Sequence, residues 1–393
     1  MGGIIGRLTS GFAEGRYIMI GPKLSCTGVR KVYRIPMAVG LAVIILLSAV
    51  MMNTITAAAE GDGKLTYSVY PYLPDAGYYA EVLEGEWEKR HPDIRLEYVP
   101  YDCYFGGKPE GIDVIMYDVI MERAFIEKGY IRSIDISDCL DTDDFYAFTL
   151  EPAAGYADNY GVPIFLCCDL LIYDGDNREL SEANDIFDVA ASDSKALISF
   201  ASYGDHVYLL DAAADITKDA QVIQYKDMLG GIDVSASKTA LAEAAIPKYT
   251  DTNSNALAAL YDSGVADGYI GYAETLRFLN RRLVNTEVKQ ISIGKNDNIP
   301  LFYCDMAGIS ADVPDDRTGL CMDLITIMTD TEVMKRVSVK DGAPQYLMFP
   351  RISFYDDMQK VYPMYAKLKT IAENDNNKLF RAYGSFMEET YGE

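Results

Sequence analysis

The sequence predicts an α/β protein that has a mostly parallel sheet and two lobes. Strand-like and helix-like segments alternate from residue 64 to about residue 128, which is typical of βαβ units. Residues 181 to about 265 are mostly helical in pattern, with alanine-rich runs, which indicates a second lobe. The 393 residues contain no internal repeat and no obvious flexible linker. We therefore expect the chain to cross between the lobes more than once.

The first part of the globular region predicts strands and helices in regular order. Its predicted elements are a strand at 65–70, a helix at 79–89 stopped by His91-Pro92, a strand at 94–99, a strand at 113–118 and a helix ending near residue 128. Ligands bind at the carboxyl ends of parallel strands in such sheets. Tyr70, Tyr104 and Asp118 are expected at strand ends, so they are candidates for a ligand site.

The segment Gly161–Tyr173 predicts two short buried strands separated by a polar break. The break consists of Cys167, Cys168 and Asp169. Side chains at a break in a buried sheet can point into a cleft, and we interpret Cys167 as a nucleophile there. The alternative is that both cysteines are small core residues, because free cysteine is among the most buried residue types.

The later part of the chain predicts further strands that end near carboxylates. Residues 269–272 form a short predicted strand that leads to Glu274, and residues 299–305 form another that ends at Asp305. From residue 343 a helical region is expected to run to the C-terminus.

Residues 1–59 have the composition of a leader. A basic patch, Arg30–Arg34, precedes the apolar core Met37–Met52, and the small residues Ala57–Ala59 follow. This order is typical of a secretory signal peptide, although an uncleaved membrane anchor is also compatible with it. We expect an exported protein, secreted, extracellular or periplasmic, which contacts a membrane only through this segment.

Composition excludes several classes of function. The formal net charge of −24 repels phosphate backbones, which excludes nucleic acid as a partner, and it would attract a small cation. The only two histidines, His91 and His206, make a Ser-His-Asp or Cys-His arrangement and a histidine zinc site improbable. The seven cysteines contain no CxxC pair. An activated cysteine in this chain should therefore use a carboxylate as its base.

Two segments resemble extracellular solute-binding proteins. Residues 83–94 have the pattern of a helix followed by a proline and a strand, and residues 113–130 continue the likeness with a strand, Asp118 and Lys-Gly-Tyr. This resemblance implies a type II periplasmic-binding-protein fold, with two lobes and a ligand cleft between them. Taken alone, it would suggest the receptor of a transporter.

A narrower resemblance, to the thiaminase I (thiamine pyridinylase) family, covers about residues 64–385. The blocks that carry it, in register, are Tyr70–Tyr72, Gly161–Tyr173, Ile270–Glu274, Ile299–Asp305, Pro344–Leu347, Tyr362–Tyr365 and Leu379–Arg381. Ordinary solute-binding proteins have no reason to keep both a cysteine and a glutamate at these places.

The resemblance implies a covalent reaction at a cysteine. In that family the cysteine attacks C6 of the aminopyrimidine of thiamine, the thiazole leaves, and an amine or thiol then displaces the enzyme. The resemblance places the nucleophile at Cys167 and the base at Glu274. A base is needed because little of a free thiol is ionised at neutral pH. As alternatives, Cys168 is the reacting thiol, or Glu274 is a solvated glutamate at a helix start.

The resemblance also assigns a pocket for the substrate. Asp118 and Asp305 are placed against the pyrimidine, where carboxylates could hold its amino group and protonated nitrogen; the alternative is that both cap helices. Aromatic faces can hold a planar ring and a thiazolium cation, although such tyrosines are also ordinary core and surface residues. The tyrosines expected in this role are Tyr70, Tyr72, Tyr104, Tyr272 and Tyr303.

The sequence thus predicts a monomeric transferase that replaces the thiazole of thiamine with a small amine or thiol, without a metal or organic cofactor. The catalytic region is 60–393. Its first lobe is mainly 64–165 with a return segment near 295–340, and its second is mainly 170–290 with the C-terminal helices. The alternative function is a non-catalytic solute-binding protein for thiamine, a pyrimidine or a sugar. A cysteine hydrolase or peptidase is disfavoured because a histidine partner is hard to find.

Overall fold

The computed structural model describes residues 63–137, 140–153, 155–197, 223–224, 254–291 and 300–381. By internal contacts the chain divides into Met1–Glu60 and Gly61–Glu393, and all the described residues belong to the second unit. The predicted leader lies outside the described residues. Within the described part, no helix is both long enough and apolar enough to cross a membrane.

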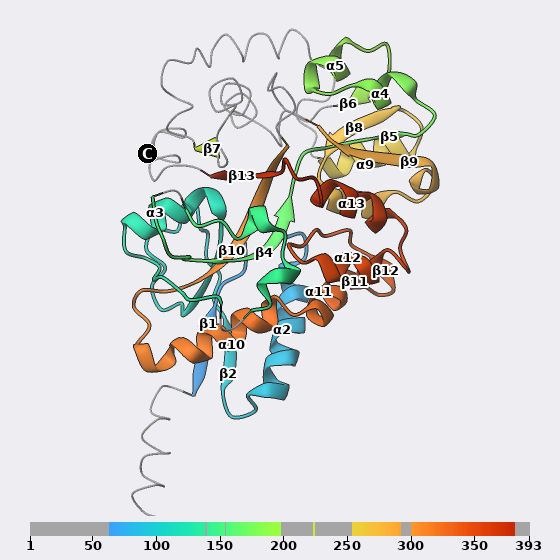
Figure 1. The fold of residues 1–393 in the computed structure, drawn as a ribbon. Coiled ribbons are helices and arrows are strands. Elements are labelled where there is room, and N and C mark those ends of the chain that lie inside the picture. Colours follow the sequence, from blue (N-terminus) through green and yellow to red (C-terminus); the bar gives the residue numbers. More distant parts are fainter. Residues whose placement is uncertain are drawn as a thin grey trace, which may run out of the picture. The chain divides into compact units, whose positions relative to one another are not determined.

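In the first part of the chain strands and helices alternate, and these strands belong to the larger sheet (Figure 1). Its strand order is β2-β1-β3-β10-β13-β7, and β4 also pairs with β10. β1 is parallel to β2 and β3, and β13 is parallel to β10 and β7, but β10 runs antiparallel to β3 and β4. The strands are β1 (Lys64–Tyr67), β2 (Arg95–Tyr98), β3 (Val114–Asp118), β4 (Val162–Cys167), β7 (Ile223–Gln224), β10 (Leu301–Ile309) and β13 (Lys378–Arg381).

The smaller sheet has the order β6-β8-β5-β9. β5 is antiparallel to both β8 and β9, and β6 is parallel to β8. Its strands are β5 (Leu170–Asp174), β6 (Ala196–Leu197), β8 (Gly268–Gly271) and β9 (Thr286–Gln290), and a separate hairpin is formed by β11 (Val339–Lys340) and β12 (Ala343–Pro344).

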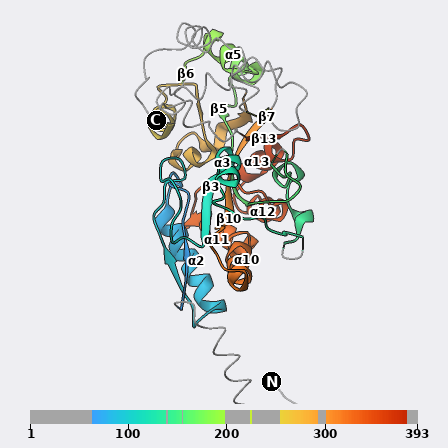
Figure 2. The same cartoon turned by 90° about the vertical axis from the view of Figure 1, so that its left-hand side faces the viewer.

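Helices surround the sheets and connect their strands. The α-helices are α2 (Ala76–Arg90), α3 (Glu122–Glu127), α4 (Arg178–Glu182), α5 (Ile186–Ala191), α9 (Ser254–Asp262), α10 (Thr318–Met328), α11 (Thr331–Val337), α12 (Ile352–Met358) and α13 (Met364–Ala372). The 3₁₀ helices are η1 (Val119–Met121), η2 (Thr142–Asp144), η3 (Ala147–Thr149), η5 (Ala273–Phe278), η6 (Leu283–Asn285) and η7 (Asp315–Arg317). Helices α4 and α9 pack on the smaller sheet. Helices α10 and α11 lie against α2 (Figure 2).

The start and end of α2 follow from local chemistry. The Asp75 side chain caps the helix by accepting a hydrogen bond of 3.1 Å from the Tyr78 backbone N–H. The helix ends before Pro92, as the sequence predicts. Trp87 is buried, and its indole N–H donates to the Ile94 carbonyl at 2.7 Å. This bond fixes the turn from α2 into β2.

The predicted polar break is the point where the chain passes from the larger sheet to the smaller one. β4 ends at Cys167 in the larger sheet, and β5 begins at Leu170 in the smaller sheet. Only Cys168 and Asp169 lie between these strands, and both are buried. The prediction of two short buried strands is confirmed, and each strand belongs to a different sheet.

Three expectations about strands are wrong. β1 ends at Tyr67 and β2 at Tyr98, so Tyr70 and Tyr104 lie beyond the strands and not at their ends. β10 continues to Ile309, so Asp305 lies inside a strand and not at its end. The register between β10 and β4 shifts between Asp305 and Met306, which marks an irregularity there. The C-terminal region is also not helical throughout, because β13 follows α13 and pairs with β10. Residues 198–222 and 225–253 of the predicted helical lobe lie outside the described residues.

Candidate active site

Cys167 is the last residue of β4 and is half-buried. Its strand partner in β10 is Tyr303. Burial raises the pKa of the Cys167 thiol well above its ordinary value, and the charge of Glu274 raises it further. The neighbouring Cys168 is buried, with 1% of its surface exposed. Of these two adjacent thiols, Cys167 is the one that a ligand can reach.

Glu274 lies in the first turn of η5, directly after β8. Because β8 pairs with β5, and β5 follows the break after Cys167, the smaller sheet brings Glu274 close enough to act on the thiol. Glu274 is half-buried, and desolvation raises the pKa of its carboxyl group. The charge of Arg277 opposes that rise. The two residues that the sequence pairs as nucleophile and base therefore interact electrostatically within one site.

Asp118 and Asp305 lie opposite each other on two neighbouring strands of the larger sheet. They are register partners in β3 and β10. Burial raises the pKa of Asp118 to about 6, although hydrogen bonds from Tyr104 and the Ile120 backbone oppose the rise. Burial, then the charges of Asp118 and Glu274, raise the pKa of Asp305 well above its usual range. The irregularity in β10 thus lies at Asp305, whose half-buried carboxyl group belongs to the site.

Asp118 caps a helix and also contacts one of the predicted site tyrosines. Its Oδ1 accepts a hydrogen bond of 3.0 Å from the Ile120 N–H and so caps η1. Its Oδ2 accepts a hydrogen bond of 2.6 Å from the Tyr104 hydroxyl, which lies 2.8 Å from the Tyr70 hydroxyl. The Tyr72 ring completes a cluster with these two tyrosines, with centroids 5.8 Å from each. Tyr72 is 61% exposed and forms the solvent side of the cluster.

Tyr272 and Tyr303 lie nearer to the thiol. The Tyr303 hydroxyl donates a hydrogen bond of 3.2 Å to Asp169 Oδ2. Burial raises the pKa of Tyr272 well above its ordinary value, and the charges of Asp169 and Cys167 raise it further. Asp169 is a further residue of the site, and it was not predicted from the sequence. Its place beside the two cysteines in the polar break was the signal that could have identified it.

The structure therefore brings all nine predicted site residues into one connected set of contacts and electrostatic interactions. Carboxyl groups and aromatic rings predominate in it, a combination that suits a planar cation. In the described part of the chain, no three histidine, cysteine, aspartate or glutamate side chains are grouped so that they could hold a metal ion.

The fold is that of two-lobed solute-binding proteins. No protein-family model matches the chain. The structure resembles that of maltose-bound MalE3 of T. maritima with a TM-score of 0.61 and 15% identity, over 83% of this chain and 91% of that one. The fold is therefore that of an α/β protein with the two-lobed type II arrangement.

Within this class the chain is a homologue of thiaminase I. It is 25% identical to Thiaminase-1 of Paenibacillus thiaminolyticus over 374 residues, which cover 88% of this chain and 90% of that protein. Its structure also matches that of Clostridium botulinum thiaminase I in complex with thiamin, with a TM-score of 0.74 and 26% identity. That match covers 83% of this chain and 96% of the other.

Proposed function

We propose that this chain degrades thiamine as a thiaminase I, a transferase that replaces the thiazole of thiamine with an external nucleophile. The chain is similar to thiaminase I over most of its length, and one of those structures holds thiamin. The observation that carries the proposal is the juxtaposition of Cys167 and Glu274 at the junction of the two sheets. A binding protein would need neither a reachable thiol nor a carboxylate beside it.

The carboxyl groups and tyrosines bind the substrate in this proposal. Asp118 and Asp305 hold the amino group and the protonated nitrogen of the pyrimidine, which makes the ring more electrophilic. The aromatic faces of Tyr72 and Tyr272 hold the planar rings and the thiazolium cation. The acidic surroundings stabilise the positive charge of thiamine, so the cation is favoured over a neutral analogue.

The first half of the reaction forms a covalent intermediate. The Cys167 thiol gives its proton to Glu274 as its sulfur bonds to C6 of the pyrimidine. The bond between the methylene carbon and the thiazolium nitrogen then breaks, and its electron pair stays on that nitrogen. The thiazole therefore leaves as a neutral molecule.

The second half transfers the pyrimidinylmethyl group to the acceptor. A small amine or thiol bonds to the methylene carbon and loses a proton, which the carboxylates and water take up. The sulfur then leaves C6 and regains its proton from Glu274. One proton is released overall, which balances the positive charge lost from thiamine.

The test uses the full-length chain, thiamine and aniline, with thiamine and free thiazole followed by chromatography. We expect wild-type protein to consume thiamine and release one thiazole per thiamine lost. Cys167→Ser should lower kcat by about six orders of magnitude, as removal of a catalytic nucleophile does elsewhere. Cys168→Ser is the matched control, since this thiol is buried and should not be required.

The opposite results would each reject a part of the proposal. Thiamine that is bound tightly but stays intact would mean a solute-binding protein. Full activity of Cys167→Ser together with its loss in Cys168→Ser would move the nucleophile to the next residue. A monomeric state, and export directed by residues 1–59, stay predictions, which sedimentation of the purified protein and sequencing of its N-terminus would test.

A further inference from the structure

In the described part of the chain, Arg277 is the half-buried arginine that forms no ion pair with a carboxylate. Most arginines there form ion pairs, as expected in a protein of net charge −24. The other two without an ion pair, Arg95 and Arg281, are exposed. Arg277 instead contacts Phe278, with its guanidinium carbon 4.7 Å from the ring centroid, and Gln345, through a long hydrogen bond of 3.5 Å.

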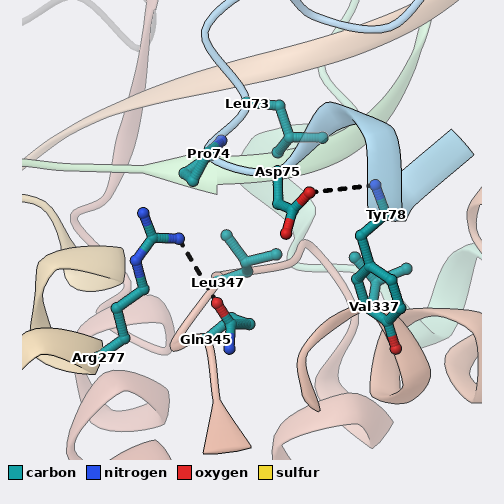
Figure 3. A pocket seen from close by; sticks show the side chains of 8 residues that line it. All are labelled: Leu73, Pro74, Asp75, Tyr78, Arg277, Val337, Gln345 and Leu347. Atoms are coloured by element: carbon teal, nitrogen blue, oxygen red, sulfur yellow. Dashed lines mark hydrogen bonds between the residues drawn. The ribbon is translucent and has the colours of Figure 1, made fainter. Parts of the chain in front are cut away.

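The guanidinium of Arg277 lies in a hollow (Figure 3). The hollow is small and open to solvent, and three separate segments of the chain line it. Leu73 and Leu347 give it apolar walls. Asp75 also lines it, but this carboxylate is already engaged by Lys340 and by the Tyr78 N–H. The hollow therefore offers a guanidinium that forms no direct ion pair in the described part of the chain, although its charge helps to lower the pKa of Asp75.

This hollow lies beside the proposed base. Arg277 follows Glu274 by three residues in the 3₁₀ helix η5, and residues at that spacing lie on the same side of such a helix. Its charge acts on the Glu274 carboxyl group. The other groups whose charges act in the site are carboxyl, thiol and phenol groups: Cys167, Cys168 and Asp169 from the crossing, Asp118 and Asp305 from the larger sheet, and Tyr272 before η5.

We propose that Arg277 binds the carboxylate of the incoming acceptor, so that the preferred acceptors are amines or thiols that carry a carboxylate. This inference rests on the proposed function. The acidic site alone would repel such an acceptor, whereas a guanidinium can bind a carboxylate through two hydrogen bonds. With its carboxylate on Arg277, the acceptor has its amine or thiol on the side of η5 that carries Glu274.

The experiment compares matched acceptors in the full-length protein. The pairs are 4-aminobenzoate with aniline, and 3-mercaptopropionate with ethanethiol, at saturating thiamine. The readout is the ratio of kcat/KM for the carboxylate acceptor to that for its neutral partner. Any effect of Arg277 on the basicity of Glu274 acts on both members of a pair, so it cancels in this ratio.

We expect Arg277→Gln to lower the ratio by about tenfold to a hundredfold, which corresponds to the loss of a hydrogen bond between charged groups. Arg277→Lys keeps the charge without the planar fork and should retain part of the preference. Arg281→Gln is the matched control, because it removes the same charge from an exposed position, and its ratio should equal that of the wild type.

An unchanged ratio in Arg277→Gln would overturn the inference while leaving the proposed function intact. The same holds if Arg277→Gln instead lowers kcat/KM for thiamine monophosphate relative to thiamine, because the anion in the hollow would then belong to the substrate. No loss of thiamine with wild-type protein and either neutral acceptor would overturn the proposed function and this inference together.

Discussion

Acidic groups surround Cys167, and they determine the protonation state of its thiol in the absence of substrate. Burial and the charge of Glu274 both keep its proton in place, since each disfavours the thiolate. Reactive cysteines more often have a depressed pKa next to a cation. In the proposed reaction the substrate supplies the cation, so we expect the thiol to become reactive when the thiazolium is bound.

The first prediction concerns the reactivity of Cys167 in the absence of thiamine. Alkylation by iodoacetamide at neutral pH should be slower than for a free thiol, and its rate should still rise above about pH 9. Glu274→Gln removes a negative charge beside the thiol, so this variant should be alkylated faster although its turnover is lost. Peptide mass spectrometry can follow Cys167 alone. Slower alkylation of the variant would mean that Glu274 already activates the thiol in the free protein.

The second prediction concerns the effect of Asp118 on stability. In the folded protein its pKa is about 6, whereas an ordinary aspartate has 3.8. The folded state therefore binds more protons than the unfolded state between about pH 4 and 6, so the free energy of unfolding falls as the pH rises through this window. Asp118→Asn should remove that fall, which is up to about 3 kcal/mol.

Urea unfolding of both proteins at pH 4 and pH 7 measures this effect. Asparagine keeps an oxygen that can accept from the Ile120 N–H, so the cap on η1 is preserved. Equal changes of stability with pH in wild type and variant would show that Asp118 does not hold its proton in the folded state.

At the scale of elements, local patterns predicted most strands and helices, but they could not predict how the strands pair. The alternation of strand-like and helix-like segments before Asp118 and the apolar runs on both sides of Cys168 each reflect local burial. Local burial can be predicted directly from the pattern of apolar residues. The position of Asp305 was missed because β10 continues past a polar residue, and only pairing with β3 and β4 reveals this. The strand β13 is short and depends on its neighbour β10, so its own residues carry little signal.

The third prediction compares two glycines in different elements. Gly161 precedes β4, and a Cβ atom there would collide with the Tyr117 hydroxyl and lie 3.1 Å from Met306 Cβ. Gly161→Ala should therefore lower the free energy of unfolding by about 1–3 kcal/mol. Gly77 in α2 has open space around it, so Gly77→Ala should raise that free energy by about 0.5–1 kcal/mol. Urea unfolding measures both, and equal effects would contradict the packing argument.

At the scale of the molecule, contacts between residues far apart in sequence join the segments that form the site. The Cys167–Glu274 pair was predicted by resemblance, since no pattern within the sequence brings residues 107 positions apart together. Asp169 and the hollow at Arg277 were not predicted, because they depend on side chains that meet only after both sheets have formed. Composition alone predicted that the base would be a carboxylate.

The fourth prediction concerns the buried ion pair between Arg381 in β13 and Glu122 in α3. Arg381 also donates to the Glu151 carbonyl at 2.6 Å, and burial lowers its pKa to about 10. Arg381→Met would leave Glu122 buried without a partner, which should lower the free energy of unfolding by about 3–5 kcal/mol. The double variant with Glu122→Leu should recover much of this loss. A double variant as unstable as the sum of both single variants would mean that the two side chains are not coupled.

The carboxyl groups around Cys167 also affect how fast molecules enter and leave the site. Their field extends beyond contact distance and speeds the diffusion of a cation toward them, an effect that salt weakens. In the proposed reaction thiamine arrives as a cation, but the thiazole departs as a neutral molecule. The attraction that aids capture therefore disappears when the carbon–nitrogen bond breaks, and the same charges that speed substrate entry do not slow release of the first product.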